Sequence, residues 1–208
     1  MKLSQSLWVG MTRFIDGACI QQANFSCPVR PPDNHLALPM HTRSFAPLAN
    51  PTARVLILGS LPGQASVRMG QYYGHPHNKF WPIMGQLFGF DPTLPYAERT
   101  QQLLQHRVAL WDVCAAAQRP GSLDSAIKQR SIEANDIAGF LRTHPAVGLI
   151  AFNGSAAAAY YRRLVLPTLP PPRQPAQFTY ANLPSTSPAN AAVPYAEKLR
   201  HWQQLRLD

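Results

Sequence analysis

The segment that most constrains the fold is a short run of aliphatic residues that ends at a glycine. Residues 54–58 read RVLIL, and Gly59 follows directly. A continuous apolar run of this length is typical of a strand that is buried on both faces, as in a parallel sheet. We predict three further strands at residues 107–113, 147–152 and 178–183. The chain is therefore expected to contain one mostly parallel sheet.

Segments with helical character separate these strands. We predict helices over residues 79–88, 96–106, 134–143, 156–164 and 194–205. Strands that alternate with helices form βαβ units, so the expected fold class is α/β, with three α/β/α layers around a central four-stranded sheet. Ligands of such sheets bind beyond the carboxyl ends of the strands. The loops expected to carry function are residues 59–78, 112–123, 153–155 and 184–190.

Residues 1–39 differ from the rest of the chain. They contain several prolines, show no sustained periodicity and lack the pattern of a signal peptide. We predict an irregular N-terminal extension, followed by one domain over residues 40–208. The segment that opens at Met40 reads like a natural protein start, which suggests that translation begins there and that the extension is not native. We expect a cytoplasmic, nucleoid-associated monomer.

Charge suggests a partner, although it does not identify one. The chain has 19 Lys and Arg against 10 Asp and Glu, a net charge of +9, while charged residues make up only 14%. A sparsely charged but basic domain fits a polyanionic partner, and it equally fits a solubility charge with no partner. No stretch of 18 apolar residues is present, which argues against a membrane helix and a membrane partner. The cysteines, Cys19, Cys27 and Cys114, are too few and too scattered for a disulfide framework, and we expect Cys114 in the core.

The first candidate motif, GSLPG at residues 59–63, follows the first strand directly. Its glycines permit a tight turn and a close approach to a ligand. It lacks the Gly-Lys-Ser/Thr ending of a phosphate loop. Taken alone, it is equally well explained as a turn between a strand and a helix.

The second motif, QYYGHPHNKFW at residues 71–81, is dense in groups that stack and form hydrogen bonds. Aromatic side chains such as Tyr73 and Phe80 can stack on a base. Asn78 is either a polar site residue or the cap of the next helix, and one role does not exclude the other. His75 and His77 match no zinc-ligand spacing, so we expect no metal and no cofactor.

The third motif, PSTSPAN at residues 184–190, follows the last strand. Short hydroxyl side chains between prolines can present hydroxyl and backbone N–H groups to phosphate. On its own, the segment is more simply a loop that leads into the final helix.

Together, these segments resemble the uracil-DNA glycosylase superfamily, and most closely its hypoxanthine-DNA (deoxyinosine) glycosylase branch. The resemblance also includes LWDV at 110–113, GSLD at 121–124 and FNG at 152–154, and it spans about residues 44–207. It implies a uracil-DNA glycosylase-like fold and a monofunctional enzyme that hydrolyses the N-glycosidic bond of deoxyinosine in double-stranded DNA, leaving an abasic site. No lysine stands in a motif position to form a Schiff base.

Departures from the superfamily pattern bear on mechanism. Many members carry Asp, Asn or Glu as the third residue of the first motif, where it positions or activates water, but this chain has Leu61. The resemblance assigns that task to Asn78, as the catalytic residue. Leu183 replaces the His or Asn that begins the last motif in uracil-specific relatives, which favours a purine substrate.

The resemblance also implies two sets of binding residues. The base is expected to contact Gly59, Ser60, Leu61, Pro62, Gly63, Tyr73, Phe80 and Asn153, with Phe80 stacking on it. The DNA is expected to contact His75, Ser185, Thr186, Ser187, Pro188 and Asn190.

The sequence alone leaves other functions open. A glycosylase of broader range could take uracil, xanthine or an alkylated base. Because Leu61 cannot activate water, a non-catalytic nucleic-acid-binding module on the same fold is also conceivable. A small-molecule nucleotide enzyme is possible on fold grounds alone.

The N-terminal segment generates the first prediction. A chain that begins at Met40 should fold and cleave DNA as the full chain does, because residues 1–39 show no pattern of a packed element. Thermal unfolding and DNA cleavage of the two chains provide the comparison. Loss of folding or of activity in the shorter chain would contradict the prediction.

Overall fold

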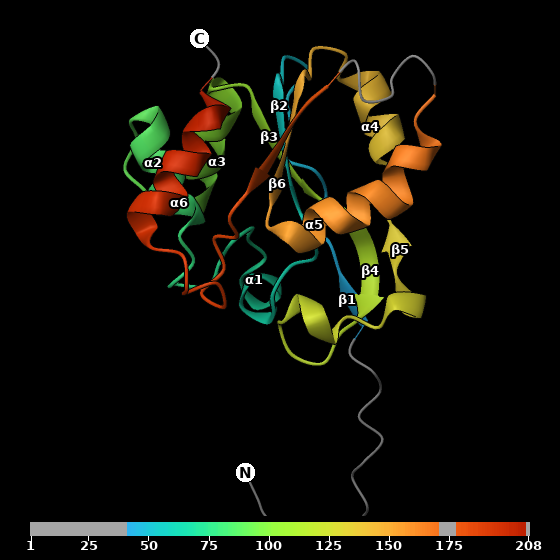
Figure 1. The fold of residues 1–208 in the computed structure, drawn as a ribbon. Coiled ribbons are helices and arrows are strands. Elements are labelled where there is room, and N and C mark those ends of the chain that lie inside the picture. Colours follow the sequence, from blue (N-terminus) through green and yellow to red (C-terminus); the bar gives the residue numbers. More distant parts are fainter. Residues whose placement is uncertain (1–40, 171–177, 207–208) are drawn as a thin grey trace, which may run out of the picture. The chain divides into compact units, whose positions relative to one another are not determined.

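The predicted parallel sheet is present in the computed structural model, which describes residues 41–170 and 178–206 (Figure 1). Its four strands are β2 (Val55–Gly59), β3 (Val108–Asp112), β6 (Leu149–Asn153) and β7 (Thr179–Leu183). They lie in the order β3-β2-β6-β7, and every pairing is parallel. The predicted extension, residues 1–39, lies outside the described residues and stays a prediction.

The side chains of β2 alternate between the two faces of the sheet and belong to two separate hydrophobic cores. Val55 and Ile57 belong to a cluster with side chains of α2 (Phe80–Phe88) and α6 (Tyr195–Trp202). Leu56 and Leu58 belong to the opposite cluster, with side chains of α4 (Ile137–Thr143) and α5 (Ser155–Tyr160). Successive side chains of a strand point to opposite faces, so a strand apolar at every position must be covered on both. The helices α2, α3 (Tyr96–Gln105) and α6 therefore lie on one face and α4 and α5 on the other (Figure 1), which confirms the three-layer α/β/α prediction.

The predicted helices are present with shifted ends. The segment after β6 continues from α5 into one π-helical stretch, Tyr161–Val165, and α6 continues into a 3-10 turn, Gln203–Leu205. Helix α4 begins later than predicted because the side chain of Asp136 accepts a 2.7 Å hydrogen bond from the Gly139 N–H and caps it there. Pro194 lies one position before the first residue of α6.

A second, smaller sheet was not predicted. It contains β1 (His41–Arg43), β4 (Cys114–Gln118) and β5 (Glu133–Ala134), paired antiparallel in the order β1-β4-β5. Residues 112–123 were expected to be a loop because CAAAQ lacks the β-branched and aromatic residues that favour strands. Cys114 is fully buried in this strand, as expected. Helix α1 (Gln64–Met69), within the segment that was expected to be a loop, was also missed.

The strand order places a crevice at one edge of the parallel sheet. From β2 the chain goes to β3 on one side, and later to β6 on the other side of β2. Such a reversal leaves the loops beyond the carboxyl ends of the strands apart, and ligands of α/β folds bind there. Within the described part of the chain, no helix is long and apolar enough to cross a membrane.

Candidate active site

The three sequence motifs meet in one pocket at the carboxyl ends of β2, β3, β6 and β7. Its lining includes most of the predicted site residues: Ser60, Leu61, Pro62, Gly63, Tyr73, His75, Asn78, Asn153, Ser185, Thr186, Ser187 and Pro188. Among the side chains to which the sequence analysis gave no role in the site, Tyr72, Asp112, Ser122 and Asp124 also line it. Segments that are more than 100 residues apart in the chain are thus brought together by the parallel sheet.

The backbone carbonyl groups of the first motif accept hydrogen bonds from donors that lie on one side of the loop. Those of Gly59 and Ser60 accept hydrogen bonds of 2.8 and 3.1 Å from the backbone N–H groups of Val113 and Cys114. Those of Leu61 and Pro62 accept hydrogen bonds from the guanidinium of Arg119, the first at 3.3 Å. Four successive carbonyl oxygens of the loop are therefore held by donors from the segment that follows β3.

This anchoring determines where the N–H groups of the loop point. In a trans peptide the C=O and N–H bonds lie on opposite sides of the chain. The N–H groups of Leu61 and Gly63 therefore point away from the anchoring donors, and neither makes a hydrogen bond within the described residues. They are the donors that the loop can offer to a bound base, as the sequence analysis expected.

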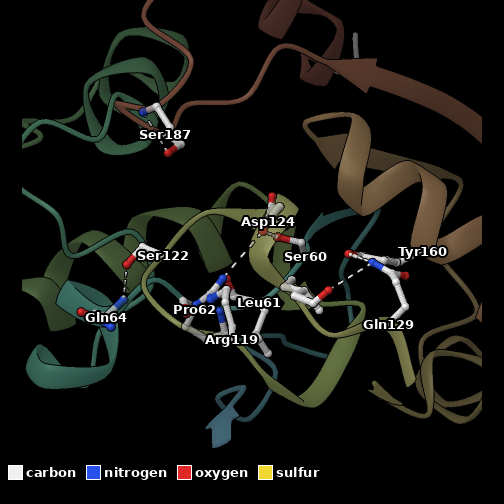
Figure 2. Close-up of polar contacts among 12 residues, drawn as sticks. Ser60, Leu61, Pro62, Gln64, Arg119, Ser122, Asp124, Gln129, Tyr160 and Ser187 are labelled. Carbon is white, nitrogen blue, oxygen red and sulfur yellow. Dashed lines mark hydrogen bonds and ion pairs between the residues drawn. The ribbon is translucent and has the colours of Figure 1, made fainter. Parts of the chain in front are cut away.

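A group of polar side chains also holds this loop, through the contacts drawn in Figure 2. Arg119 is 1% exposed, and its guanidinium lies 3.7 Å from the carboxylate of Asp124. That carboxylate accepts a 2.7 Å hydrogen bond from the Ser60 hydroxyl, and the Ser122 hydroxyl accepts one of 3.1 Å from the Gln64 N–H. A buried arginine held by a carboxylate and two carbonyls fixes the loop geometry before any ligand arrives.

Tyr73 adopts a strained backbone conformation. Its φ is +55°, a region that bulky residues rarely occupy. The peptides on either side are held in place: the Tyr72 carbonyl accepts a 3.0 Å hydrogen bond from the indole N–H of Trp81, and the Gly74 N–H donates to the Ser66 hydroxyl at 3.1 Å. Strain of this kind persists only where the surroundings over-determine it, and it is concentrated at functional sites.

The position of Tyr73 corrects the expectation for Phe80. Phe80 is fully buried, and one face of its ring is covered by the Tyr73 ring at a centroid distance of 3.9 Å and an interplanar angle of 20°. The edges of Trp81 and Trp202 pack on it as well. Phe80 therefore cannot stack on a base directly. It supports Tyr73, which is the ring that lines the pocket.

Asn78 lines the pocket and also stabilises the start of α2. Its Oδ1 accepts a 2.9 Å hydrogen bond from the Phe80 N–H, and its own N–H donates to the carbonyl of His75 at 2.8 Å. An amide oxygen can accept two hydrogen bonds, so one lone pair of Oδ1 is left, together with the Nδ2 donors. Both interpretations of Asn78 are thus compatible with the structure: one side of the amide holds the helix while the rest is available to the pocket.

Asn153 and Thr186 connect the ends of β6 and β7. Nδ2 of Asn153 donates to the Thr186 hydroxyl at 2.9 Å, and Oδ1 accepts from the Thr186 N–H at 2.9 Å. Thr186 is fully buried, so its predicted contact with DNA is wrong. Gly154 allows this approach, since its φ is +99° and a Cβ would lie 3.0 Å from the side chain of Ser185.

The remaining residues of the last motif divide into two groups. The hydroxyl oxygens of Ser185 and Ser187 accept hydrogen bonds from the N–H groups of Ser187 and Ala189, at 3.2 and 3.3 Å. Their hydroxyl hydrogens stay available as donors. Asn190 lies outside the pocket lining and donates from Nδ2 to the Ser185 carbonyl at 3.1 Å, so it braces the loop.

His75 lines the pocket, and both His75 and His77 are exposed. Nδ1 of His75 accepts a 3.1 Å hydrogen bond from the His77 N–H, which leaves Nε2 as the outward-facing N–H of a neutral ring. In the described part of the chain, no three His, Cys, Asp or Glu side chains gather closely enough to hold a metal ion.

Asp112 is the buried acid of the pocket. It is 4% exposed and stands at the end of β3, directly opposite Gly59 on β2. A Cβ on Gly59 would overlap Oδ1 of Asp112 and would come 3.4 Å from the Tyr73 hydroxyl, so a glycine is required here. Burial raises the pKa of the Asp112 carboxyl to about 7, and a hydrogen bond from Ser44 to Oδ2 at 3.4 Å acts in the opposite direction.

Comparison with known proteins agrees with this geometry. The sequence profile of the Uracil DNA glycosylase superfamily matches residues 46–206. The chain belongs to this superfamily. Among curated superfamily relatives, a "Hypoxanthine DNA glycosylase" of Methanosarcina barkeri is 38% identical over 122 residues, which are 58% of this chain and 76% of the relative. The Methanosarcina acetivorans protein of the same name is 39% identical over the same shares of both chains.

A solved structure extends the likeness to the fold. It is a solution NMR structure from Methanosarcina acetivorans, described as a candidate uracil DNA glycosylase. It superimposes with a TM-score of 0.66 at 33% sequence identity, over 80% of this chain and 99% of that one. The superfamily fold expected from the sequence motifs is therefore confirmed.

The site combines a stacking surface, free backbone donors and a buried acid. Sequence motifs located the loops of this superfamily member, but they did not indicate the depth at which each side chain lies. LWDV was a motif of the resemblance, yet its Asp112 was not among the expected site residues. A signal was present in the sequence, because an ionisable residue at the end of an apolar strand is carried to the ligand-binding edge of the sheet.

The buried acid yields a stability prediction with a definite sign. The unfolded chain ionises Asp112 near pH 3.9, whereas the folded chain keeps its proton until about pH 7. Folding is therefore penalised increasingly as pH rises between these values, by about 4 kcal/mol at most above pH 7. Asp112→Asn removes this penalty and should raise the free energy of unfolding at pH 8 but hardly at pH 4.

Urea denaturation at the two pH values measures this difference. Glu133→Gln is the control, since Glu133 is an exposed acid that lies outside the pocket lining and whose side chain accepts no hydrogen bond within the described residues. An Asp112→Asn variant less stable than wild type at pH 8 would show that the carboxylate is stabilised in the fold.

Proposed function

We propose that this protein is a DNA glycosylase that hydrolyses the N-glycosidic bond of deoxyinosine and releases hypoxanthine. The observation that carries the proposal is the position of Asn78, whose amide lines the same pocket as Leu61, the first-motif residue that cannot position water. The two curated relatives named hypoxanthine DNA glycosylase support the choice of base.

Binding begins with the phosphate backbone. The net charge of +9 favours association with DNA through release of counterions. The hydroxyl donors of Ser185 and Ser187 and the Nε2 of exposed His75 stand at the mouth of the pocket, where they can hold phosphates on either side of the target. Pro188 is exposed beside them and would approach the groove.

The target nucleotide must then leave the duplex. Unstacking costs least at a mispair such as inosine opposite thymine. The extruded base would stack on Tyr73, whose ring is backed by Phe80, and its polar edge would meet the N–H groups of Leu61 and Gly63. The strained backbone of Tyr73 presents this surface without rearrangement on binding.

Hydrolysis uses a positioned water molecule. As the bond between C1′ and N9 stretches, positive charge develops on the sugar and negative charge on the base. The free lone pair of Asn78 Oδ1 accepts a hydrogen bond from water and directs its oxygen toward C1′. An amide is a weak base, so positioning and electrostatics supply most of the rate acceleration.

The activity is tested by single-turnover cleavage of duplexes that carry one inosine, uracil, xanthine or alkylated base. The proposal expects cleavage at inosine to exceed that at uracil. Equal cleavage of several bases would favour a glycosylase of broader range. Tight binding without any cleavage would indicate a non-catalytic module.

Asn78→Ala should lower the single-turnover rate on inosine DNA by orders of magnitude and leave DNA affinity nearly unchanged, because the lost contact acts mainly in the transition state. Loss of the hydrogen bond to Phe80 should cost about 1 kcal/mol of stability.

Two further variants separate catalysis from capping. Asn78→Ser and Asn78→Asp both preserve a side-chain acceptor for the Phe80 N–H. We expect a severe defect in Asn78→Ser, because the hydroxyl is too short to reach the water, and partial activity in Asn78→Asp. Wild-type cleavage by Asn78→Ser would show that Asn78 has a structural role alone.

A further inference from the structure

The deep end of the pocket contains two polar groups that the described chain leaves without adequate partners. The Tyr73 hydroxyl is buried, and among the described residues no group meets it with hydrogen-bond geometry; the Asn153 amide lies near enough to lower its pKa but is engaged by Thr186. Oδ1 of Asp112 makes none within the described residues, and Oδ2 shares a single donor, since the Ser44 hydroxyl lies 3.0 Å from the Phe45 carbonyl and 3.4 Å from Oδ2. A buried polar group without a partner is costly, so its retention in a pocket points to a ligand.

The surroundings of Asp112 favour its neutral form. Tyr72, Tyr73 and Cys114, which act on it from α1–α2 and β4, have pKa values raised by burial and are uncharged at neutral pH. Asn135, from the segment before α4, donates to the Asp112 carbonyl at 2.8 Å and brings no charge.

Two charged groups act on Asp112 in opposite directions. The Asp124 carboxylate raises its pKa, and the Arg119 guanidinium lowers it by a smaller amount. That guanidinium is already engaged by Asp124 and by the carbonyls of Leu61 and Pro62. His75, which also lines the pocket, lies at its exposed mouth. No cation among the described residues is therefore paired with the Asp112 carboxyl.

The location of Asp112 selects the part of a base that it can reach. A base that stacks on Tyr73 keeps its sugar toward the pocket mouth, where Asn78 and the serines of the last motif lie. One long edge of the purine then runs from the mouth toward the buried end. In hypoxanthine that edge carries N7 and, farther from C1′, O6, and both are acceptors.

We propose that Asp112 acts as a general acid that donates its carboxylic proton to N7 of the departing purine. This step rests on the proposed deoxyinosine glycosylase function and names the chemistry that makes the site select purines. Uracil has no ring nitrogen that could accept a proton at the corresponding edge, so it gains nothing from the acid.

In the proposed step, the electron pair of the bond between C1′ and N9 passes into the purine ring, while the proton of Asp112 forms a bond with N7. Hypoxanthine leaves as a neutral base with hydrogen on N1 and N7. The water held by Asn78 adds its oxygen to C1′, and its released proton returns to the Asp112 carboxylate or passes to solvent. The abasic sugar and the protonated acid are then restored.

The test compares two proteins on two substrates. Wild type and Asp112→Asn are assayed by single turnover on duplexes with deoxyinosine or 7-deaza-deoxyinosine, which has carbon in place of N7. On deoxyinosine, the wild-type rate should fall about tenfold per pH unit above pH 7 to 8, as the acid loses its proton. The rate of Asp112→Asn should be about 100-fold lower at pH 6 and independent of pH. On the 7-deaza substrate both proteins should be equally slow at every pH.

Matched controls separate this step from folding and from the proposed function. Asp91→Asn, an acid outside the pocket, should keep the wild-type rate and pH profile. The 7-deaza arm uses wild-type protein, so it remains informative if Asp112→Asn folds poorly. A wild-type rate and profile in Asp112→Asn, or no effect of the missing N7 on wild type, would overturn the general acid alone. Failure of wild type to cleave deoxyinosine would instead remove the proposed function together with this step.

Discussion

The close contact between the backbone of Gly59 and the carboxyl group of Asp112 determines how the rest of the site is arranged. Parallel pairing of β2 with β3 brings these two residues opposite each other at the end of both strands. Because Gly59 has no side chain, the carboxyl can lie over its backbone beside the Tyr73 hydroxyl. Any larger residue would displace the acid, the tyrosine or the turn that follows. The floor of the pocket is thus a consequence of strand register.

From this point the first motif continues with its carbonyl groups held by β4 and by Arg119. The small antiparallel sheet therefore has a role in the site. Cys114 of β4 holds the Ser60 carbonyl, and Arg119, directly after β4, holds the Pro62 carbonyl, so the N–H groups of Leu61 and Gly63 point away from these donors. Tyr73 completes the wall at the cost of a strained φ, and Phe80 supports it from behind. Stability is given up at two positions, the buried acid and the strained tyrosine, and both face the pocket.

The sequence predicted the structure correctly where the local residue pattern and the tertiary environment favour the same conformation. The aliphatic run that ends at Gly59 can only be a buried strand in this context, and the loop that follows must then lie at the binding edge. Strand β4 escaped prediction because its alanines show no preference for strands. The stacking contact was assigned to Phe80 for a different reason. Which of two nearby rings faces a pocket depends on the positive φ of Tyr73, and a sequence pattern does not reveal it. Thr186 likewise reads as an exposed hydroxyl until its two hydrogen bonds to Asn153 are known.

In the proposed complex, a flipped purine lies on Tyr73 with its O6 and N7 edge at Asp112 and its C1′ beside Asn78. A crystal structure with duplex DNA that contains a 2′-fluorinated deoxyinosine, whose glycosidic bond resists cleavage, tests this arrangement directly. We expect the hypoxanthine ring to stack on Tyr73, with N7 within hydrogen-bond distance of the Asp112 carboxyl and a water between Asn78 and C1′. A base bound outside the pocket, or one with its N7 edge turned toward the mouth, would contradict it.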